Sequence, residues 1–419
     1  MRVLALGVLF AAGAVSAQPA PEPADADALL LADQTQSATQ TASDWHIFTE
    51  GALVRKTQRT GSTPVENQRL SLDLSYDSSF APGWRVVLAD RLDVNWQGRI
   101  SDQSSINTLK EAYLNWQAGA NQLLDLGRIN ARYGVATGYN PTDFFRGGAV
   151  RSITSVDPNS LRRNRLGSVM LRSQTLWTGG ALTALYAPKL AEQPSDAPFS
   201  ADLGATNGRN RWLVSGSQQI SEGFSPQWSV YGEERMRPQL GFNLTTLVSD
   251  ASVAYVEWSG GRSRSLRSEA LNGSDDTAFR NRLATGLTYT TAAKLSLTLE
   301  YQYNGAGLDP AGWNALGRGP LPAYMQYRRV AADRQDLPTR QALFLFSSWQ
   351  DAFVNKLDLS ALMRLNFADH SRMAWFEARY HWTKTDLALQ WQLNTGRAAS
   401  EFGALPQRRV LQAVVTYFF

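Results

Sequence analysis

From Trp45 to the end of the chain, apolar and polar residues alternate with a period of two. In the stretch NKLDLSALMRLNF, residues 355–367, every second residue from Leu357 to Phe367 is apolar, and most residues between them are polar. A period of two predicts a β-strand with one apolar and one polar face. The same alternation recurs in KLSLTLEYQYN, TDLALQWQLN and WRVVLADRLDVNW.

Segments of this kind predict about 18 strands. They lie at 45–57, 67–77, 84–97, 107–117, 121–129, 166–177, 179–188, 210–220, 226–235, 238–249, 251–260, 279–290, 293–305, 341–350, 355–367, 371–382, 385–395 and 408–419. If two weak strands near 226–249 are miscounted, the number is 16.

The connections between these strands differ in length in a regular way. Those after even-numbered strands are short, whereas several after odd-numbered strands are long, namely 130–165, 189–209, 261–278, 306–340 and 396–407. Outer-membrane barrels have short periplasmic turns and longer extracellular loops. The sequence therefore predicts an all-β fold, a transmembrane antiparallel up-and-down β-barrel with long extracellular loops.

A soluble β-sandwich is the alternative for alternating strands. Sandwich strands average about 5 to 6 residues, whereas these patterns hold for about 10 residues and end in Trp or Tyr, as in a membrane barrel. Aromatic residues at both ends of an apolar band suit the two membrane interfaces. The pattern favours the membrane barrel.

The first 17 residues, MRVLALGVLFAAGAVSA, have the layout of a secretory signal peptide. Arg2 precedes an apolar run from Val3 to Val15, and small residues follow up to Ala17. A membrane anchor would need roughly 20 apolar residues. Residues 18–44 are rich in Ala, Pro, Asp and Ser and predict a flexible periplasmic segment, so that the barrel occupies 45–419.

The composition agrees with an exported barrel. The chain has no cysteine, 13 Trp, 14 Tyr and 17 Phe, and only 19% charged residues. Its mean hydropathy of −0.30 is too polar for a helical membrane protein. In a barrel, however, lipid-facing and lumen-facing residues alternate and their hydropathies average out.

The last strand carries an apolar face that ends at the final residue. Its members are Leu411, Ala413, Val415, Tyr417 and Phe419. This stretch resembles the closing strand of bacterial outer-membrane proteins, and the resemblance implies that the barrel-insertion machinery reads it. The physical need is clear, because an unpaired edge strand must be closed against the first strand in lipid.

A second resemblance covers about positions 108–146. The order LKEAYLNW, LLDLGRINARYG and GYNPTDFF is similar to that in the porin-like outer-membrane β-barrel superfamily of Gram-negative bacteria. There a strand ending in Gly-Arg runs into Tyr-Gly or Trp-Gly and then an Asn-Pro loop. The resemblance implies the fold and an outer-membrane location, but no substrate.

Positive charge is concentrated in the long connection after the fifth predicted strand, which is the third connection after an odd-numbered strand. The segment 128–165 holds seven arginines and two aspartates, a net charge of +5, whereas the whole chain has +4. The candidate constriction residues are Arg128, Arg132, Arg146, Arg151, Arg162, Arg163 and Arg165, with Asp143 and Asp157. Turns followed by short helices are expected after Pro141 and Pro158.

Such a loop could fold into the barrel and narrow it, where guanidinium groups would favour carboxylates or phosphates. The alternatives are an exposed loop that contacts lipopolysaccharide phosphates, or one that pairs with an acidic wall. Charges on the polar strand faces are nearly balanced, which suits a hydrophilic pore and equally a braced lumen. The candidate lumen-wall residues are Arg85, Arg91, Asp93, Glu300, Arg364, Glu377 and Arg379.

Enzymatic chemistry has little support in the sequence. The chain has three histidines, of which His381 shares a strand face with Glu377 at a spacing of four. A hydrolase would need such a histidine beside a nucleophile and an acid, but lone inward histidines more often line a pore. No phosphate-binding Gly-Lys motif or metal-ligand spacing occurs, so no enzyme, cofactor, metal or nucleic-acid partner is expected.

The sequence thus predicts an outer-membrane channel for passive diffusion of small solutes, preferably anionic or amphipathic. A non-conducting envelope protein in surface-polymer export or assembly is the first alternative, and an outer-membrane hydrolase is the second. The expected partners are outer-membrane lipid and lipopolysaccharide, the barrel-insertion machinery and a small solute. The substrate, the pore size and the oligomeric state stay open.

Overall fold

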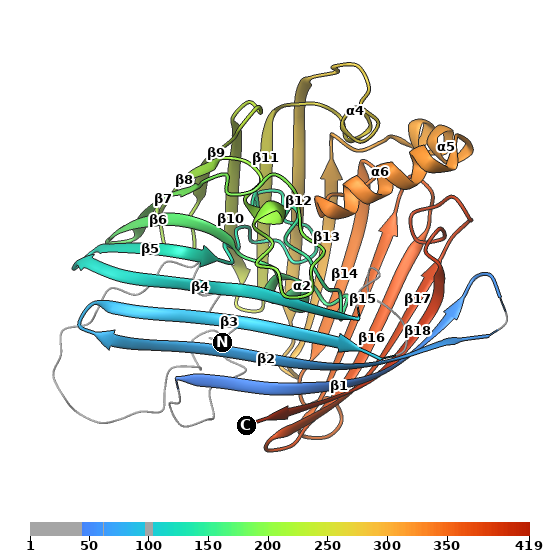
Figure 1. Ribbon diagram of the computed structural model, residues 1–419, viewed down its shortest axis with the longest axis horizontal. Helices are drawn as coiled ribbons and strands as arrows, with labels where there is room; N and C mark the ends of the chain where they lie inside the picture. The colour runs from blue at the N-terminus through green and yellow to red at the C-terminus, as the bar shows by residue number, and fades with distance from the viewer. Residues whose placement is uncertain (1–43, 62, 97–103) are drawn as a thin grey trace.

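A computed structural model describes residues 44–61, 63–96 and 104–419. The chain forms one antiparallel sheet of 18 strands that closes on itself, because β1 pairs with both β2 and β18 (Figure 1). The predicted 18-strand barrel is confirmed, and the alternative of 16 strands is wrong. The predicted signal peptide, 1–17, and all of the segment 18–44 except Asp44 lie outside the described residues.

The strands have the following bounds: β1 Trp45–Gln58, β2 Val65–Ala81, β3 Trp84–Asn95, β4 Ser105–Gly119, β5 Gln122–Ile129, β6 Ser168–Trp177, β7 Gly180–Ala187, β8 Arg211–Gln218, β9 Gln227–Glu233, β10 Gln239–Ser249, β11 Ser252–Ser263, β12 Ala278–Thr290, β13 Leu295–Asn304, β14 Gln341–Trp349, β15 Leu357–Asn366, β16 Arg372–His381, β17 Thr385–Thr395 and β18 Gln407–Phe418. Each predicted strand has its counterpart here.

The barrel closes through its last strand, as the chain's aromatic ending predicts. Phe48 of β1 lies opposite Phe418 of β18, with ring centroids 5.8 Å apart. On the outer face of this seam, Leu411, Val415 and Tyr417 are between 41% and 47% exposed. The closing strand therefore presents its apolar face outward, and its role as an insertion signal stays a prediction.

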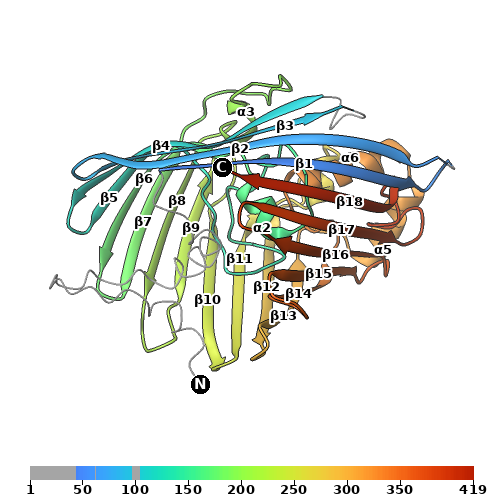
Figure 2. The ribbon, with the colours of Figure 1, turned by 90° about the horizontal axis from the view of Figure 1, so that it is seen from below.

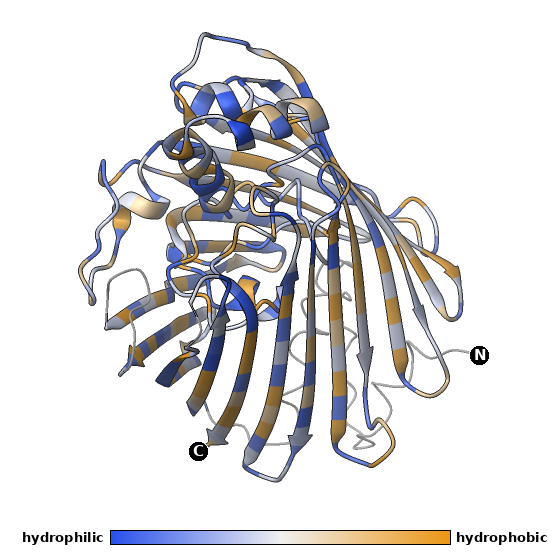
Figure 3. Ribbon diagram, turned by 90° about the vertical axis from the view of Figure 1, so that its right-hand side faces the viewer, coloured by the Kyte–Doolittle hydropathy of each residue, from blue (hydrophilic) through white to orange (hydrophobic). Residues whose placement is uncertain are grey.

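The alternation read from the sequence is visible on the barrel wall. In Figure 3 the strands show bands of hydrophobic and hydrophilic residues along their length. Leu126, Leu299 and Leu389 are 62%, 49% and 56% exposed on the outside, where a soluble protein would bury such side chains. Near the turn between β2 and β3, Trp84 stacks on Trp116 at 5.4 Å, as expected at a membrane interface.

Helices occur in the long connections. They are α2 Pro158–Arg163, α3 Leu203–Thr206, α4 Leu266–Ala270, α5 Pro310–Arg318 and α6 Leu321–Asp333. Among the described residues, no helix is long and apolar enough to cross a membrane. In Figure 1, α4, α5 and α6 lie together at one end of the barrel, the end opposite the described chain termini.

The two predicted helical turns have different outcomes. Asp157 caps α2 by accepting a hydrogen bond from the Ser160 backbone N–H at 2.8 Å, so the helix after Pro158 is confirmed. The helix predicted after Pro141 is wrong, because residues 141–146 form successive turns. There the Thr142 N–H donates to Glu257 of the barrel wall at 2.8 Å instead of joining a helical ladder.

Candidate pore constriction and lumen

The connection between β5 and β6, residues 130–167, folds into the barrel, and we call it the constriction loop. Figure 2 shows α2, which belongs to this loop, inside the ring of strands. The contacts of this loop with the wall include an apolar cluster at β5–β9, two carboxylates on β11 and β13, and a patch where Val156 packs on the cluster of Phe344 and Trp375. The loop therefore crosses the lumen.

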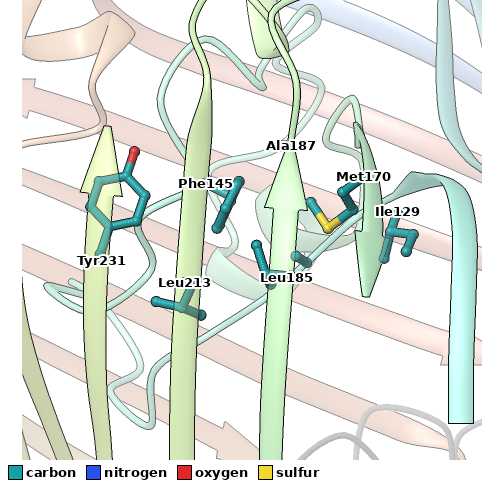
Figure 4. Close-up of a cluster of buried hydrophobic side chains, with 8 residues drawn as sticks. Ile129, Phe145, Met170, Leu185, Ala187, Leu213 and Tyr231 are labelled. Carbon is teal, nitrogen blue, oxygen red and sulfur yellow. The ribbon is translucent and has the colours of Figure 1, made fainter. Parts of the chain in front are cut away.

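The apolar contact fixes one end of the constriction loop. Phe145 packs among Ile129, Leu185, Leu213 and Tyr231, which come from strands on that side of the barrel (Figure 4). The ring of the neighbouring Phe144 stacks on Tyr231 with centroids 4.5 Å apart. Burial of several apolar side chains at about 1.5–3 kcal/mol each makes this end a packed core.

Three predicted constriction residues, Arg165, Asp143 and Arg146, are buried in two ion pairs. Arg165 donates to Asp143 at 2.8 Å, and these side chains are 2% and 1% exposed. Arg146 pairs with Asp336, which lies just after α6. These pairs fix the loop to itself and to the segment 305–340.

Asp336, which follows α6, is the centre of a polar cluster. It also accepts a hydrogen bond from the Tyr139 hydroxyl at 2.9 Å. Burial opposes the charge on Asp336, but Arg282 and Arg146 outweigh it and lower the pKa of this carboxyl. Asp336 therefore keeps its negative charge beside the two arginines.

Arg128 and Arg151 brace the barrel wall. Arg128 shares a face of β5 with the exposed Leu126 and donates to the carbonyls of Gly167, at 2.9 Å, and Ala201, at 2.6 Å. Arg151 donates to the Asn107 carbonyl on β4 at 2.7 Å. β4 pairs with β5 only from Ala112 onward, so Arg151 satisfies a strand edge that β5 leaves open.

The constriction loop borders a cavity of about 2890 Å³ inside the barrel. From the predicted constriction set, Arg132, Asp157, Arg162 and Arg163 line it. Burial raises the pKa of Asp157. The cavity reaches the barrel end that carries the short turns and the described termini, and no residue of 188–210, 262–277, 305–340 or 396–406 lines it.

The cavity lining thus includes four of the nine predicted residues, and the role of the set in a pore stays a prediction. Arg128, Arg146, Arg151, Arg165 and Asp143 do not line the cavity, because backbone carbonyls or buried ion pairs hold their side chains. All nine residues were assigned from local charge density alone. The local charge density identifies the loop, but it does not show whether each side chain points toward the cavity or toward the wall.

Only some of the predicted lumen-wall residues line the cavity. Arg91, Glu377 and Arg379 line the cavity. Asp93 lies beneath Arg91, which it contacts at 3.0 Å, and is fully buried. Glu300 faces inward but is covered by the constriction loop. Arg85, which pairs with Asp77 near a turn, and Arg364 do not line the cavity, and the place of all seven residues on the lumen wall stays a prediction.

Several residues that line the cavity were not predicted from the sequence. The register between β3 and β4 shifts at Ala89 and Asp90, so that Lys110 and Glu111 both line the cavity although they are adjacent in sequence. Arg172 faces Asp125 at 2.7 Å. The extra residue of this bulge is Lys110, which lies between the paired Leu109 and Glu111, so the period of two is interrupted on β4.

His381 lines the cavity at the end with the short turns. Its Nδ1 lies 3.0 Å from Asp386, and its Nε2 lies 3.2 Å from Asp358. Since both ring nitrogens face carboxylates, the imidazole bridges two strands and has no nitrogen directed at a hydroxyl nucleophile.

Comparison with protein-family models and with curated protein sequences gives no match. The fold is similar to solved outer-membrane porins. OccAB1 of Acinetobacter baumannii is 11% identical, with a TM-score of 0.56 over 91% of this chain and 98% of that one. OccK2 (OpdF) of Pseudomonas aeruginosa in complex with glucuronate is 11% identical, with a TM-score of 0.56 over 90% and 98%.

A BenF-like porin from Pseudomonas fluorescens Pf-5 is 9% identical, with a TM-score of 0.58 over 90% of this chain and 98% of that one. The expected likeness to porin-like outer-membrane β-barrels is confirmed at the level of the fold. Because only a closed barrel can present such strands to lipid, this fold places the chain in an outer membrane.

Proposed function

We propose that this protein is exported by its signal peptide and forms an outer-membrane channel through which small solutes diffuse, with a preference for anionic ones. The observation that carries the anionic preference is the pair Arg162 and Arg163 on the cavity face of the constriction loop. Arg163 is exposed, and Arg162 donates to the Tyr133 carbonyl at 3.3 Å. The ion pairs among the described residues include neither of them.

Three other basic residues that line the cavity have close acidic partners. Lys110 lies 2.8 Å from Asp73, and Arg172 lies 2.7 Å from Asp125. Arg379 lies 3.0 Å from Glu377. These pairs largely cancel in the field that a solute meets, whereas Arg162 and Arg163 add positive charge at the loop, where an anion passes closest to it.

The wall opposite much of this charge is polar but uncharged. Its lining side chains include Thr183, Ser217, Gln227, Thr288, Thr298 and Ser348. Hydroxyl and amide groups of this kind can exchange hydrogen bonds with solute hydroxyls. A solute with a carboxylate and several hydroxyls, such as a sugar acid, suits both walls, and OccK2, which shares the fold, is in complex with glucuronate.

Neutralising the two loop arginines should reduce anion preference. For the R162Q/R163Q variant we expect the chloride-to-potassium permeability ratio to fall about two- to fivefold, because a unit charge near 4 Å in water contributes about 1 kcal/mol. Reversal potentials in a salt gradient across a planar bilayer measure this ratio. The control is R85Q, which removes one charge outside the cavity and should leave the ratio unchanged.

Liposome swelling with glucuronate, glucose and glucosamine tests the solute class. We expect glucuronate to enter fastest and glucosamine slowest. Equal rates would contradict the anionic preference but not the channel. If the purified barrel gave no discrete conductance at all, the channel itself would be wrong, and the non-conducting envelope protein would take its place.

A further inference from the structure

Two buried glutamates of the barrel wall hold the constriction loop through the loop's own backbone. We infer that Glu257 on β11 and Glu300 on β13 are the positioning residues of the constriction, because their carboxylates fill two anion-binding concavities formed by the backbone of residues 134–142. Both side chains are fully buried, with exposed fractions of 0%. Neither glutamate takes part in an ion pair among the described residues.

Glu257 fills the first concavity. Its carboxylate accepts hydrogen bonds from the backbone N–H groups of Val135, Ala136 and Thr142 at 2.8, 2.9 and 2.8 Å. The Thr142 hydroxyl donates to it at 2.9 Å, and the side-chain amide of Asn140 at 3.2 Å. Five neutral donors thus stand in for a counter-ion.

Glu300 fills the second concavity, which begins at Thr137, directly after Ala136 of the first concavity. Three consecutive N–H groups, of Thr137, Gly138 and Tyr139, donate to it at 2.8, 3.0 and 2.9 Å. The wall adds the Tyr255 hydroxyl at 2.6 Å and the Gln302 amide at 2.7 Å. Converging backbone N–H groups are a recognised way to bind an anion.

Two glycines let the loop approach this closely. A Cβ on Gly134, whose φ is +97°, would lie 2.5 Å from a carboxylate oxygen of Glu257. A Cβ on Gly138 would lie 2.6 Å from the Phe344 ring and 2.7 Å from the Gln302 amide. The Tyr-Gly and Asn-Pro elements of the sequence motif therefore frame the segment that binds the two carboxylates.

The two filled concavities hold the constriction loop in place. A wall side chain occupies each concavity, so these backbone N–H groups are not available to a passing solute. Removing a carboxylate frees donors of the right geometry for a small external carboxylate and at the same time releases the loop. The width of the pore should therefore depend on whether each concavity is filled, whichever ions the channel prefers.

The test is to empty the second concavity and refill it. E300A removes a CH₂–COO⁻ unit that acetate matches in size, and acetamide is its neutral analogue. We expect hydrogen exchange of amides 137–139 to accelerate about tenfold or more, as for loss of one hydrogen bond to a charged group, and acetate but not acetamide to restore protection. Conductance should rise and become noisier, and acetate should reverse this.

The matched control is E377A, which removes a carboxylate that lines the cavity and contacts Arg379 and Gln390. It should change neither the exchange of the loop amides nor their response to acetate. If E300A does not assemble, G134A and E300Q replace it. G134A weakens the first concavity and E300Q the second, and both variants keep a wall side chain at each site.

Unchanged exchange in E300A, or equal effects of acetate and acetamide, would overturn the inference. The exchange measurement requires no conduction, so its failure and the failure of the proposed channel are distinguishable.

Discussion

Replacing Asp143 with alanine should lower the free energy of unfolding by about 3–5 kcal/mol, because it leaves the guanidinium of Arg165 buried without its partner. Arg165 is 2% exposed, and its Nε and Nη2 have no hydrogen-bond partner among the residues that the structure describes. The single contact to Asp143 at 2.8 Å is therefore what compensates its desolvation. Urea unfolding in phospholipid vesicles, followed by Trp fluorescence, measures the loss.

The double variant D143A/R165M is the control for this prediction. It removes both charges and places an apolar side chain of similar length in the site. Buried pairs replaced in this way are often neutral or more stable by 1–4 kcal/mol, so we expect the double variant to unfold near the wild-type urea concentration. If the double variant lost as much as D143A, packing of the loop rather than charge would explain the effect.

The fold follows from the sequence because lipid and lumen impose a simple rule on every strand. Each of the 18 strands was predicted, including the short β9, since alternate residues must be apolar wherever they touch hydrocarbon. The connections around α5 and α6 were placed correctly as long loops. Their helices were not, because Trp313 and Tyr327 pack on partners such as Leu266 that are distant in sequence.

The site was less predictable, since a charged side chain in a loop can turn to either side. The arginine-rich loop was found from its net charge, yet Arg163 faces the cavity while Arg165, two residues later, is buried. The two glutamates that hold the loop have no local signal. Glu257 and Glu300 look like ordinary polar positions of an alternating strand, and their partners are the backbone N–H groups of a segment more than 100 residues away.

An arginine on the lipid-facing side of a strand should destabilise the barrel strongly. Leu389 lies in the middle of β17 and is 56% exposed on the outer face. For L389R we expect a loss of about 2–4 kcal/mol, the cost of an arginine at the bilayer midplane of a transmembrane barrel. The same urea unfolding in vesicles measures it.

Two matched variants on β17 show whether the loss depends on the membrane depth and the strand face of the arginine, or only on its size. T385R places the arginine at the first residue of the strand, where the interfacial cost is about 0–1 kcal/mol. Q390R points it into the cavity beside Glu377, where Gln390 now donates a hydrogen bond, so we expect little change in stability. Equal losses for L389R and Q390R would mean that the outer face of β17 does not meet hydrocarbon, which would contradict the membrane barrel itself.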